Sequence, residues 1–519
     1  DLAIKLSMLL VFFAVMVGIG LYCRRHATDV SGFVLGGRSV GPWLTAFAYG
    51  TSYFSAVVFV GYAGQFGWKY GIAATWAGLG NAFLGSLLAW AVLGRRTRVM
   101  TQHLDSATMP EFFGKRFGSR SLKLAASVII FIFLIPYTAS LYNGLSRLFG
   151  MAFDIDYSVC VVVMAVLTGV YVIAGGYMAT AINDFVQGII MIVGIIAVIA
   201  AVLHSHGGFM AALEGLAQVS DPSVSDAPGV FASFFGPDPA GLLGVVLLTS
   251  LGTWGLPQMV QKFYAIKSEK SINTGMVIST VFAVIVSGGC YFLGGFGRLY
   301  SGQVNVAAEG YDAIIPTMLS DLSTVLIAIV VILVLSASMS TLSSLVLASS
   351  STLTLDFIKD NLIKDMDEKR QVRWMRALVV VFIAISVVLA IIQYQSNVTF
   401  IAQLMGISWG ALAGAFLAPF LYALYWKRTT KAACAASFLF STVVMLCNIF
   451  FADFFPSLLQ SSINCGAFCM LAGLVIVPVV SVLTRAPEQS RLQEIFSCYD
   501  RTVTVTVKDS IGRGGERRK

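Results

Sequence analysis

Hydroxyl side chains are concentrated in one apolar stretch of the chain. Residues 336–344 read SASMSTLSS, six hydroxyls in nine positions, between the apolar runs 325–335 and 345–348. On a helix, Ser340 and Thr341 lie about 100° apart and can converge on one point between them. Hydroxyl and carbonyl oxygens without a carboxylate suit a hard monovalent cation, because divalent cations usually need carboxylates. The pair predicts a sodium site. The alternative is that these hydroxyls bond within their own helix or join neighbouring helices.

Two other apolar runs are interrupted by small and polar residues. The run 40–61 contains GTSYFS at 50–55, and the run 239–256 contains TSLGTWG at 249–255 with Pro257 after it. Helix-breaking sequence inside a membrane is tolerated where it faces protein or a water-filled cavity. The two runs are the second and the seventh spans, five positions apart in the series, so they cross in opposite directions, as the first members of two inverted repeats would. This pattern predicts a transporter with a central site. Close helix packing through small residues is the alternative.

The elements that position these residues are membrane spans. The chain has 519 residues, of which 57% are hydrophobic and 12% charged, so it is not a soluble protein with a polar shell. A bilayer core about 30 Å thick needs roughly 20 apolar residues per helix. We expect an all-α polytopic membrane protein with about thirteen spans, near 3–23, 40–61, 71–94, 122–146, 158–176, 184–203, 239–256, 274–297, 322–350, 377–394, 399–425, 430–451 and 463–483.

Basic residues predict the orientation. If the N-terminus lies outside, 30 of the 34 Lys and Arg fall in the inside segments 24–39, 95–123, 257–273, 351–376, 426–431 and 484–519. Cytoplasmic loops of membrane proteins carry this excess. We therefore expect a plasma-membrane protein with its N-terminus outside and its C-terminus in the cytoplasm. The net charge of +8 reflects this bias, so we expect no nucleic-acid partner.

Motifs of soluble enzymes are absent from the sequence. It contains neither GxxxxGK nor HExxH, and the eight cysteines have no CxxC spacing. The HSH at 204–206 is the only histidine pair that suggests a metal, and a solvated outside loop explains it better. We expect no enzyme activity and no metal other than sodium.

The solute is expected near the membrane midplane, between the interrupted spans and their neighbours. Residues with a polar tip or an amphipathic ring in the second, fourth, seventh and eleventh spans are the candidates for binding it: Tyr53, Tyr137, Ser140, Asn143, Thr253, Trp254 and Trp409. Ordinary packing is the alternative for each. No basic residue is predicted inside these spans, so hydroxyls, backbone N–H groups and a positive half-helix end would meet a solute carboxylate.

Four motifs resemble the sodium/solute symporter family. They are GGRSVGPWLTA (36–46), AINDFVQG (181–188), MSTLSS (339–344) and WGALAGAFLAPFLYALYWKRTTKAA (409–433), and the likeness runs through about residues 5–485. The resemblance implies a leucine-transporter-type 5+5 inverted repeat, with one extra helix before it and two after it. The expected divisions are 1–39, the first repeat 40–203, an extracellular loop 204–238, the second repeat 239–425, two peripheral helices 426–483 and a cytoplasmic tail 484–519.

The resemblance also implies site residues. The sodium ligands would be the backbone carbonyls of Thr51, Phe54 and Ala337 together with the hydroxyls of Ser340 and Thr341. Asp184 would be a way station for sodium leaving towards the cytoplasm. From the sequence alone, Asp184 can instead cap the N-terminus of the predicted helix 184–203, and the two roles are compatible.

The implied function is sodium-coupled import of a small organic solute by alternating access, with one copy of the chain sufficient. Tyr53, Ser55 and the GLP at 255–257 resemble sodium/pantothenate symporters. Proline symporters carry other residues at Tyr53, Thr249 and Thr253. The solute is therefore left open between a pantothenate-like carboxylate and an amino acid. A membrane solute sensor and a proton-coupled symporter are the alternatives.

Overall fold

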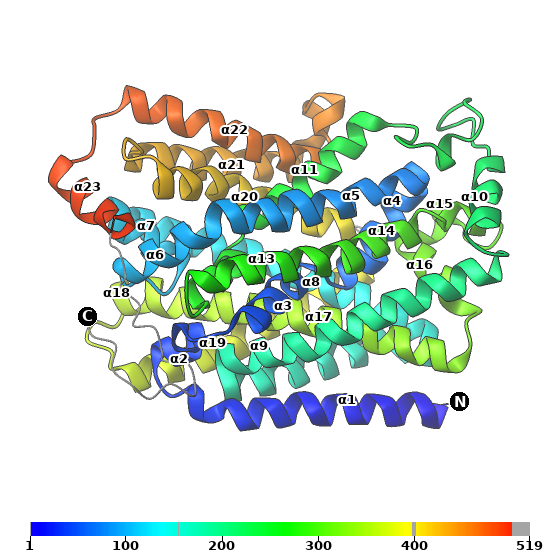
Figure 1. Cartoon of the computed structure of the whole chain (residues 1–519), viewed down its shortest axis with the longest axis horizontal. Helices are drawn as coiled ribbons and strands as arrows, with labels where there is room; N and C mark the ends of the chain where they lie inside the picture. Colours follow the sequence, from blue (N-terminus) through cyan, green and yellow to red (C-terminus); the bar gives the residue numbers. More distant parts are fainter. Residues whose placement is uncertain (1, 154, 397–400, 501–519) are drawn as a thin grey trace, which may run out of the picture.

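The computed structural model describes residues 2–153, 155–396 and 401–500, and within these ranges the chain is helical. Its only β pairings there are isolated bridges, Val40 with Ile266 and Asp221 with Ser225. Figure 1 shows the helices running along the longest axis of the molecule as one bundle. The expected all-α membrane fold is confirmed.

The first half of the bundle is formed by α1 (Leu2–Cys23), α2 (Val30–Leu35), α3 (Pro42–Tyr53), η3 (Val57–Tyr62), α4 (Ala63–Tyr70), α5 (Thr75–Gly80), η5 (Asn81–Leu88), η6 (Trp90–Gly94), α6 (Arg95–His103), α7 (Met109–Phe117), α8 (Arg120–Phe153) and α9 (Tyr157–Ser205).

The second half is formed by α10 (Phe209–Gln218), α11 (Pro239–Gly255), α12 (Pro257–Ala265), α13 (Lys270–Ala283), η8 (Val284–Gly288), α14 (Gly289–Gly294), α15 (Val306–Glu309), α16 (Ile314–Ser320), α17 (Thr324–Thr352), η11 (Leu353–Ile358), α18 (Lys359–Asn361), α19 (Glu368–Ser396), α20 (Ile401–Tyr425), α21 (Lys431–Phe451), α22 (Ser462–Leu483) and α23 (Gln489–Phe496). The segments η3, η5, η6, η8 and η11 are π-helical.

The described residues contain ten helices long and apolar enough to span a membrane, or eleven if the bent pair α11 and α12 is one span. Two of the ten, 57–103 and α9, have 47 and 49 residues. A straight helix of that length would measure roughly 70 Å, twice the bilayer core. Each contains a glycine with positive φ, Gly71 and Gly176, that no continuous helix allows. If both helices are divided at these glycines and the pair α11 and α12 counts as one span, the total is thirteen. The count nevertheless stays a prediction.

Short helices gather at the two ends of the bundle. In Figure 1, α2, α6, α7, α18 and α23 lie at one end, and α10, α15 and α16 lie at the other. The first group belongs to the segments predicted inside and the second to those predicted outside, with 204–238 among them. The model contains no membrane, so the orientation stays a prediction. Residues 501–519 of the predicted tail lie outside the described residues.

Two helices are interrupted in the same way. In α3, Phe54 follows the helix with ψ of 119°, and its N–H donates back to the Gly50 carbonyl. In α11, Leu256 follows with ψ of 125°, and its N–H donates to the Gly252 carbonyl. The chain then resumes as η3 in the first case and as α12, starting at Pro257, in the second. The last carbonyls of α3 and α11 therefore lose their helical donors, as the sequence predicted.

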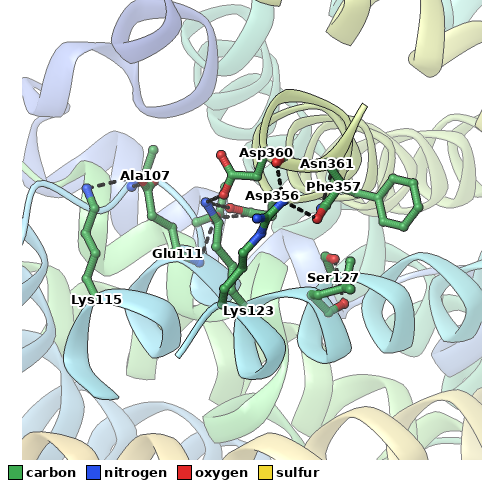
Figure 2. A network of polar contacts seen from close by, with 12 residues as sticks. Ala107, Glu111, Lys115, Lys123, Ser127, Asp356, Phe357, Asp360 and Asn361 are labelled. Atoms are coloured by element: carbon green, nitrogen blue, oxygen red, sulfur yellow. Dashed lines mark hydrogen bonds and ion pairs between the residues drawn. The ribbon is translucent and has the colours of Figure 1, made fainter. Parts of the chain in front are cut away.

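Charged side chains join α7, α8, η11 and α18 at the end of the bundle predicted to lie inside (Figure 2). Lys123 forms ion pairs with Asp360 at 2.6 Å and with Asp356 at 3.4 Å, and the Asp356 side chain has no exposed surface. The Thr108 hydroxyl also donates to Asp356. Thr108 caps α7 by accepting from the Glu111 N–H. The network ties the cap of α7 to η11 through one buried carboxylate.

Replacing Lys123 by alanine should destabilise the folded protein by about 3 kcal/mol, because the Asp356 carboxylate would stay buried without its partner. A drop of several degrees in the apparent melting temperature of detergent-solubilised protein would show this. Lys115→Ala is the matched control, since Lys115 pairs with Glu111 at 3.0 Å on an exposed surface and should contribute under about 1 kcal/mol. Equal melting temperatures for the two variants would contradict this role of Asp356.

Candidate functional site

Five oxygen atoms from two helices meet at the interruption of α3. The Ser340 hydroxyl lies 3.0 Å from the carbonyl oxygens of Thr51 and Ala337. The Thr341 hydroxyl lies 3.1 Å from the carbonyl oxygens of Thr51, Phe54 and Ala337. The structure thus brings together all five residues that the sequence and the family resemblance selected. All of them are buried.

The five oxygens make more close contacts with one another than their hydroxyl hydrogens can turn into hydrogen bonds. The two hydroxyls carry one hydrogen each, yet they make five close approaches to carbonyl oxygens, so at most two of those approaches are hydrogen bonds at one time. The remaining contacts place acceptor against acceptor in a buried setting, which costs free energy. A small cation at the centre of the five oxygens would remove that cost. The group can therefore hold a monovalent cation with oxygen ligands alone.

The other four hydroxyls of 336–344 have different surroundings. Ser343 bonds back to the Ser340 carbonyl at 2.9 Å, and Ser344 reaches the Ser52 hydroxyl of α3 at 2.9 Å. These contacts stabilise the helix and join it to its neighbour. Ser336 and Ser338 are buried and have no hydrogen-bond partner among the described residues. Bonding within or between helices therefore explains only part of the polar stretch.

Three aromatic residues predicted for the solute lie together beside the cation site. The Trp409 ring on α20 lies 6.2 Å from the Tyr53 ring and 6.0 Å from the Tyr137 ring. A Cβ added at Gly252 would lie 2.3 Å from Trp409, so the ring packs against the interrupted α11 at its glycine. The Tyr137 hydroxyl and the Trp409 indole N–H are buried without a partner among the described residues. The Tyr137 hydroxyl also lies near the Trp409 indole and the Ser55 hydroxyl, so it can accept as well as donate.

The other four predicted solute residues are not brought into this cluster. Ser140 donates to the Tyr137 carbonyl, and Asn143 accepts from Tyr157 of α9. Thr253 donates to the carbonyl of Gly85, and the Trp254 indole donates to that of Leu84. Ser140 and Asn143 lie on α8, and Thr253 and Trp254 lie on α11, which correspond to the predicted fourth and seventh spans. Ser140 bonds within its own helix, and neighbouring helices supply the partners of Asn143, Thr253 and Trp254.

A polar chain that the sequence analysis missed continues from Tyr53. The Tyr53 hydroxyl donates to Ser287 at 2.7 Å, and Asn81 donates to the same Ser287 hydroxyl at 2.9 Å. Ser250 of α11 donates to Asn81 at 3.2 Å. Asn81 and Ser287 lie on the π-helical segments η5 and η8, a local geometry that often marks functional sites. A lone asparagine inside an apolar run was the available sequence signal.

Asp184 does not cap a helix, and that expectation was wrong. The helix containing it begins after the break at Gly176, so Asp184 lies about two turns inside. Its side chain is buried, and neither carboxylate oxygen has a hydrogen-bond partner among the described residues. The predicted helix began at residue 184 and not after Gly176, because the run YMATAIND (177–184) is less apolar than the residues that follow it.

The position of Lys262 also differs from its prediction. The sequence placed this residue in the inside connection 257–273. In the structure it lies on α12 and is 1% exposed. Pro257 ends α11 as predicted, but proline is also favoured at the first position of a helix, and here it starts α12. A basic residue is therefore buried within the bent helix pair.

A cavity of about 490 Å³ opens at the end of the bundle where α10, α15 and α16 lie. Its wall includes Lys69, Asp221, Asp238 and Arg298. The Ser223 hydroxyl and the Arg298 guanidinium hold the pKa of Asp221 below its ordinary value, so Asp221 is ionised at neutral pH. The cavity is polar, and its wall carries side chains of both charges.

Comparison with known proteins adds three findings. The model of the sodium:solute symporter family matches residues 33–441. A sodium/proline symporter of Staphylococcus aureus strain JH9 is 28% identical over 499 residues, which cover 92% of this chain and 93% of that relative. The solved structure of a sodium-coupled sialic acid symporter, substrate-bound and outward-open, has a TM-score of 0.73 at 17% identity and covers 94% of this chain and 98% of the other. At that identity the likeness establishes the fold alone, which is of the expected leucine-transporter type.

Proposed function

Because the chain belongs to the sodium:solute symporter family, we propose that it imports a small organic solute by alternating access. Sodium is its coupling ion, and symport is its reaction class. The proposal adds the direction of transport, the residues that hold the ion and the class of solute. One observation carries it, namely the five buried oxygens of α3 and α17 that meet at the interruption of α3.

The sodium site couples the ion to the solute through α3. Thr51 and Phe54 would bind the ion through carbonyls that the interruption frees, while Tyr53 lies between them in sequence and contacts Trp409. Sodium would thus order the same turn that forms one wall of the aromatic box. Without the ion, the acceptor oxygens repel one another and the turn loses its support. A solute that needs the box then binds better when sodium is present.

The solute is proposed to carry a carboxylate. The Tyr137 hydroxyl and the Trp409 N–H are two buried donors without a hydrogen bond of good geometry among the described residues, and a carboxylate would accept from both at once. Proline and sialic acid, named for the relatives above, are both carboxylic acids. Organic acids of the pantothenate kind and amino acids share this group. Small carboxylates are therefore the first class to test.

The driving force is the sodium gradient. Each sodium ion that moves inward across about 100 mV releases about 2.3 kcal/mol, and its concentration gradient adds to this. Uptake into proteoliposomes of radiolabelled proline, other amino acids and pantothenate, each with an inward sodium gradient and with potassium instead, tests the proposal. Sodium-dependent accumulation of at least one carboxylate is expected. Failure of every carboxylate, with accumulation of a neutral solute, would contradict the solute class.

Tyr137→Phe should raise the KM for the transported solute by about tenfold or more, because a hydrogen bond to a charged group contributes about 1.5–3 kcal/mol. The sodium concentration for half-maximal uptake should change little, since Tyr137 contacts none of the five oxygens. Initial uptake rates over a solute series measure both values. Tyr422→Phe is the control, because its hydroxyl bonds to the Leu474 carbonyl at the α20–α22 contact. An unchanged KM in Tyr137→Phe would remove Tyr137 from the solute site.

A further inference from the structure

Lys262 is a buried cation that the proposed transport cycle has not yet used. It lies on α12, the half of the bent pair that follows Leu256, and is 1% exposed. Its ammonium nitrogen donates to the Ser344 hydroxyl at 3.1 Å and lies 5.0 Å from the centre of the Tyr177 ring. Burying an ammonium group is costly unless a negative charge offsets it. The position of that negative charge indicates what Lys262 does.

Asp184 supplies the negative charge. Tyr177 and Asp184 are seven residues apart on the uninterrupted part of α9, so both lie on the helix face that Lys262 approaches. The Lys262 ammonium and the Asp184 carboxylate therefore approach the same side of α9. Yet no hydrogen bond or ion pair reaches Asp184 among the described residues. The Asp184 carboxylate thus lies on the face of α9 that Lys262 approaches, and both of its oxygens are without a hydrogen-bond donor among the described residues.

Other buried acceptor oxygens without a donor lie next to Asp184 along α9. The side-chain oxygens of Asn183 and Gln187, on either side of Asp184, are also buried without a donor among the described residues. The amide nitrogens of Asn183 and Gln187 approach Met16 of α1, so among these four acceptor oxygens only the two of Asp184 belong to a group that can carry a charge. This is the chemical environment that a passing monovalent cation would find favourable.

Lys262 also lies next to the sodium site. Ser344, to which it donates, follows Thr341 by one turn of α17 and contacts Ser52, the neighbour of Thr51. The order along this path is therefore the five site oxygens, the hydroxyls of Ser52 and Ser344, the Lys262 ammonium and finally Asp184. One helical turn and one hydrogen bond separate the ammonium from the site, roughly 8 Å.

We propose that the Lys262 ammonium is a built-in competitor of sodium for Asp184, and that it lowers the sodium affinity of the site so that the ion can leave. The inference rests on the proposed sodium site. When sodium occupies the site, the sodium ion and the Lys262 ammonium compete for the single Asp184 carboxylate. Sodium that moves towards Asp184 displaces the ammonium, and the ammonium returns to Asp184 when sodium has left. Asp184 is thus never left without a cation.

The proposal predicts opposite effects for the two charges. Lys262→Met keeps the length of the side chain and removes its charge, so sodium should bind at least tenfold more tightly, because like charges roughly 8 Å apart repel appreciably at an effective dielectric constant of about 20. Asp184→Asn leaves the ammonium without its partner, so sodium should bind at least tenfold more weakly. The double variant should bind sodium within about threefold of the unchanged protein. An ion pair with a merely structural role would lower stability in both single variants and shift sodium affinity in neither.

Sodium binding can be measured without knowing the solute. The melting temperature of the full chain in detergent is followed as sodium chloride replaces choline chloride at constant ionic strength, and the half-saturating sodium concentration is the readout. Lys267→Met is the matched control, since Lys267 is exposed and lies five residues further on. It should leave the half-saturating concentration unchanged.

The possible results separate the two proposals. If the unchanged protein shows no sodium-dependent stabilisation, the sodium site itself is wrong. If it responds to sodium but Lys262→Met does not bind more tightly, or Asp184→Asn does not bind more weakly, only the role of Lys262 is overturned. If Asp184→Asn fails to fold, the double variant must bind sodium more weakly than Lys262→Met. If Lys262→Met fails to fold, the double variant is compared with Asp184→Asn. Removing Lys262 must then tighten sodium binding in that background, and any other result overturns the proposal.

Discussion

Thr341→Ala should reduce the apparent sodium affinity by about tenfold to a hundredfold and reduce uptake at low sodium in the same proportion. The Thr341 hydroxyl is the one side-chain oxygen that lies 3.1 Å from all three carbonyls of the group. Loss of an interaction with a charged partner in a buried setting costs about 1.5–3 kcal/mol. Ser340→Ala should act in the same direction. Initial rates of uptake in proteoliposomes, measured against sodium concentration, give the affinity.

Two further variants make this test specific. Thr341→Ser keeps the hydroxyl and should retain sodium affinity close to that of the unchanged protein. Ser350→Ala removes a hydroxyl of the same helix that only bonds back to the Leu347 carbonyl, and it should change nothing. Sodium dependence that stays unaltered in both Ser340→Ala and Thr341→Ala would rule out these residues as ligands.

Gly67→Ala should prevent normal folding. A Cβ at Gly67 of α4 would lie 1.9 Å from the carbonyl oxygen of Gly294 on α14, and a Cβ at Gly294 would lie 2.1 Å from the carbonyl oxygen of Ala63. The obstacle on each side is main chain, which cannot rotate away, so the cost should reach or exceed the 1–3 kcal/mol typical of overpacking. The monodisperse yield on size-exclusion chromatography and the melting temperature measure the effect.

Gly18→Ala is the matched control for this substitution. A Cβ at Gly18 of α1 meets no atom within 4 Å. Alanine is favoured over glycine inside a helix by roughly 0.5–1 kcal/mol, so this variant should be as stable as the unchanged protein or slightly more stable. If Gly67→Ala were tolerated equally well, the close contact of α4 with α14 would not be needed for folding.

The transported solute remains outside what the fold determines. The fold likeness joins this chain to a sialic acid symporter, and the sequence relatives include proline symporters, although their solutes differ greatly in size. The family match and the shared fold therefore leave the solute open. We propose that the aromatic box of Tyr53, Tyr137 and Trp409 selects the solute, and that its two donors favour molecules with an acceptor group.

The sequence by itself determined the features that depend on neighbouring residues. Apolar runs of the length of a bilayer predicted the helices, small and polar residues within two of them predicted the interruptions, and helical spacing selected Ser340 and Thr341. Each of these follows from local chemistry, because hydropathy, helix breaking and the 3.6-residue period all act within a few turns of one segment.

Only the tertiary structure decided which distant atoms meet. It placed the carbonyls of Thr51 and Phe54 against the hydroxyls of α17, and it gathered three of the seven predicted solute residues while satisfying the other four elsewhere. It also buried Lys262 near Asp184, where the sequence had indicated a loop and a helix cap. These outcomes depend on how helices far apart in the chain pack together, and that packing is set by shape and by hydrogen-bond partners that no single segment contains.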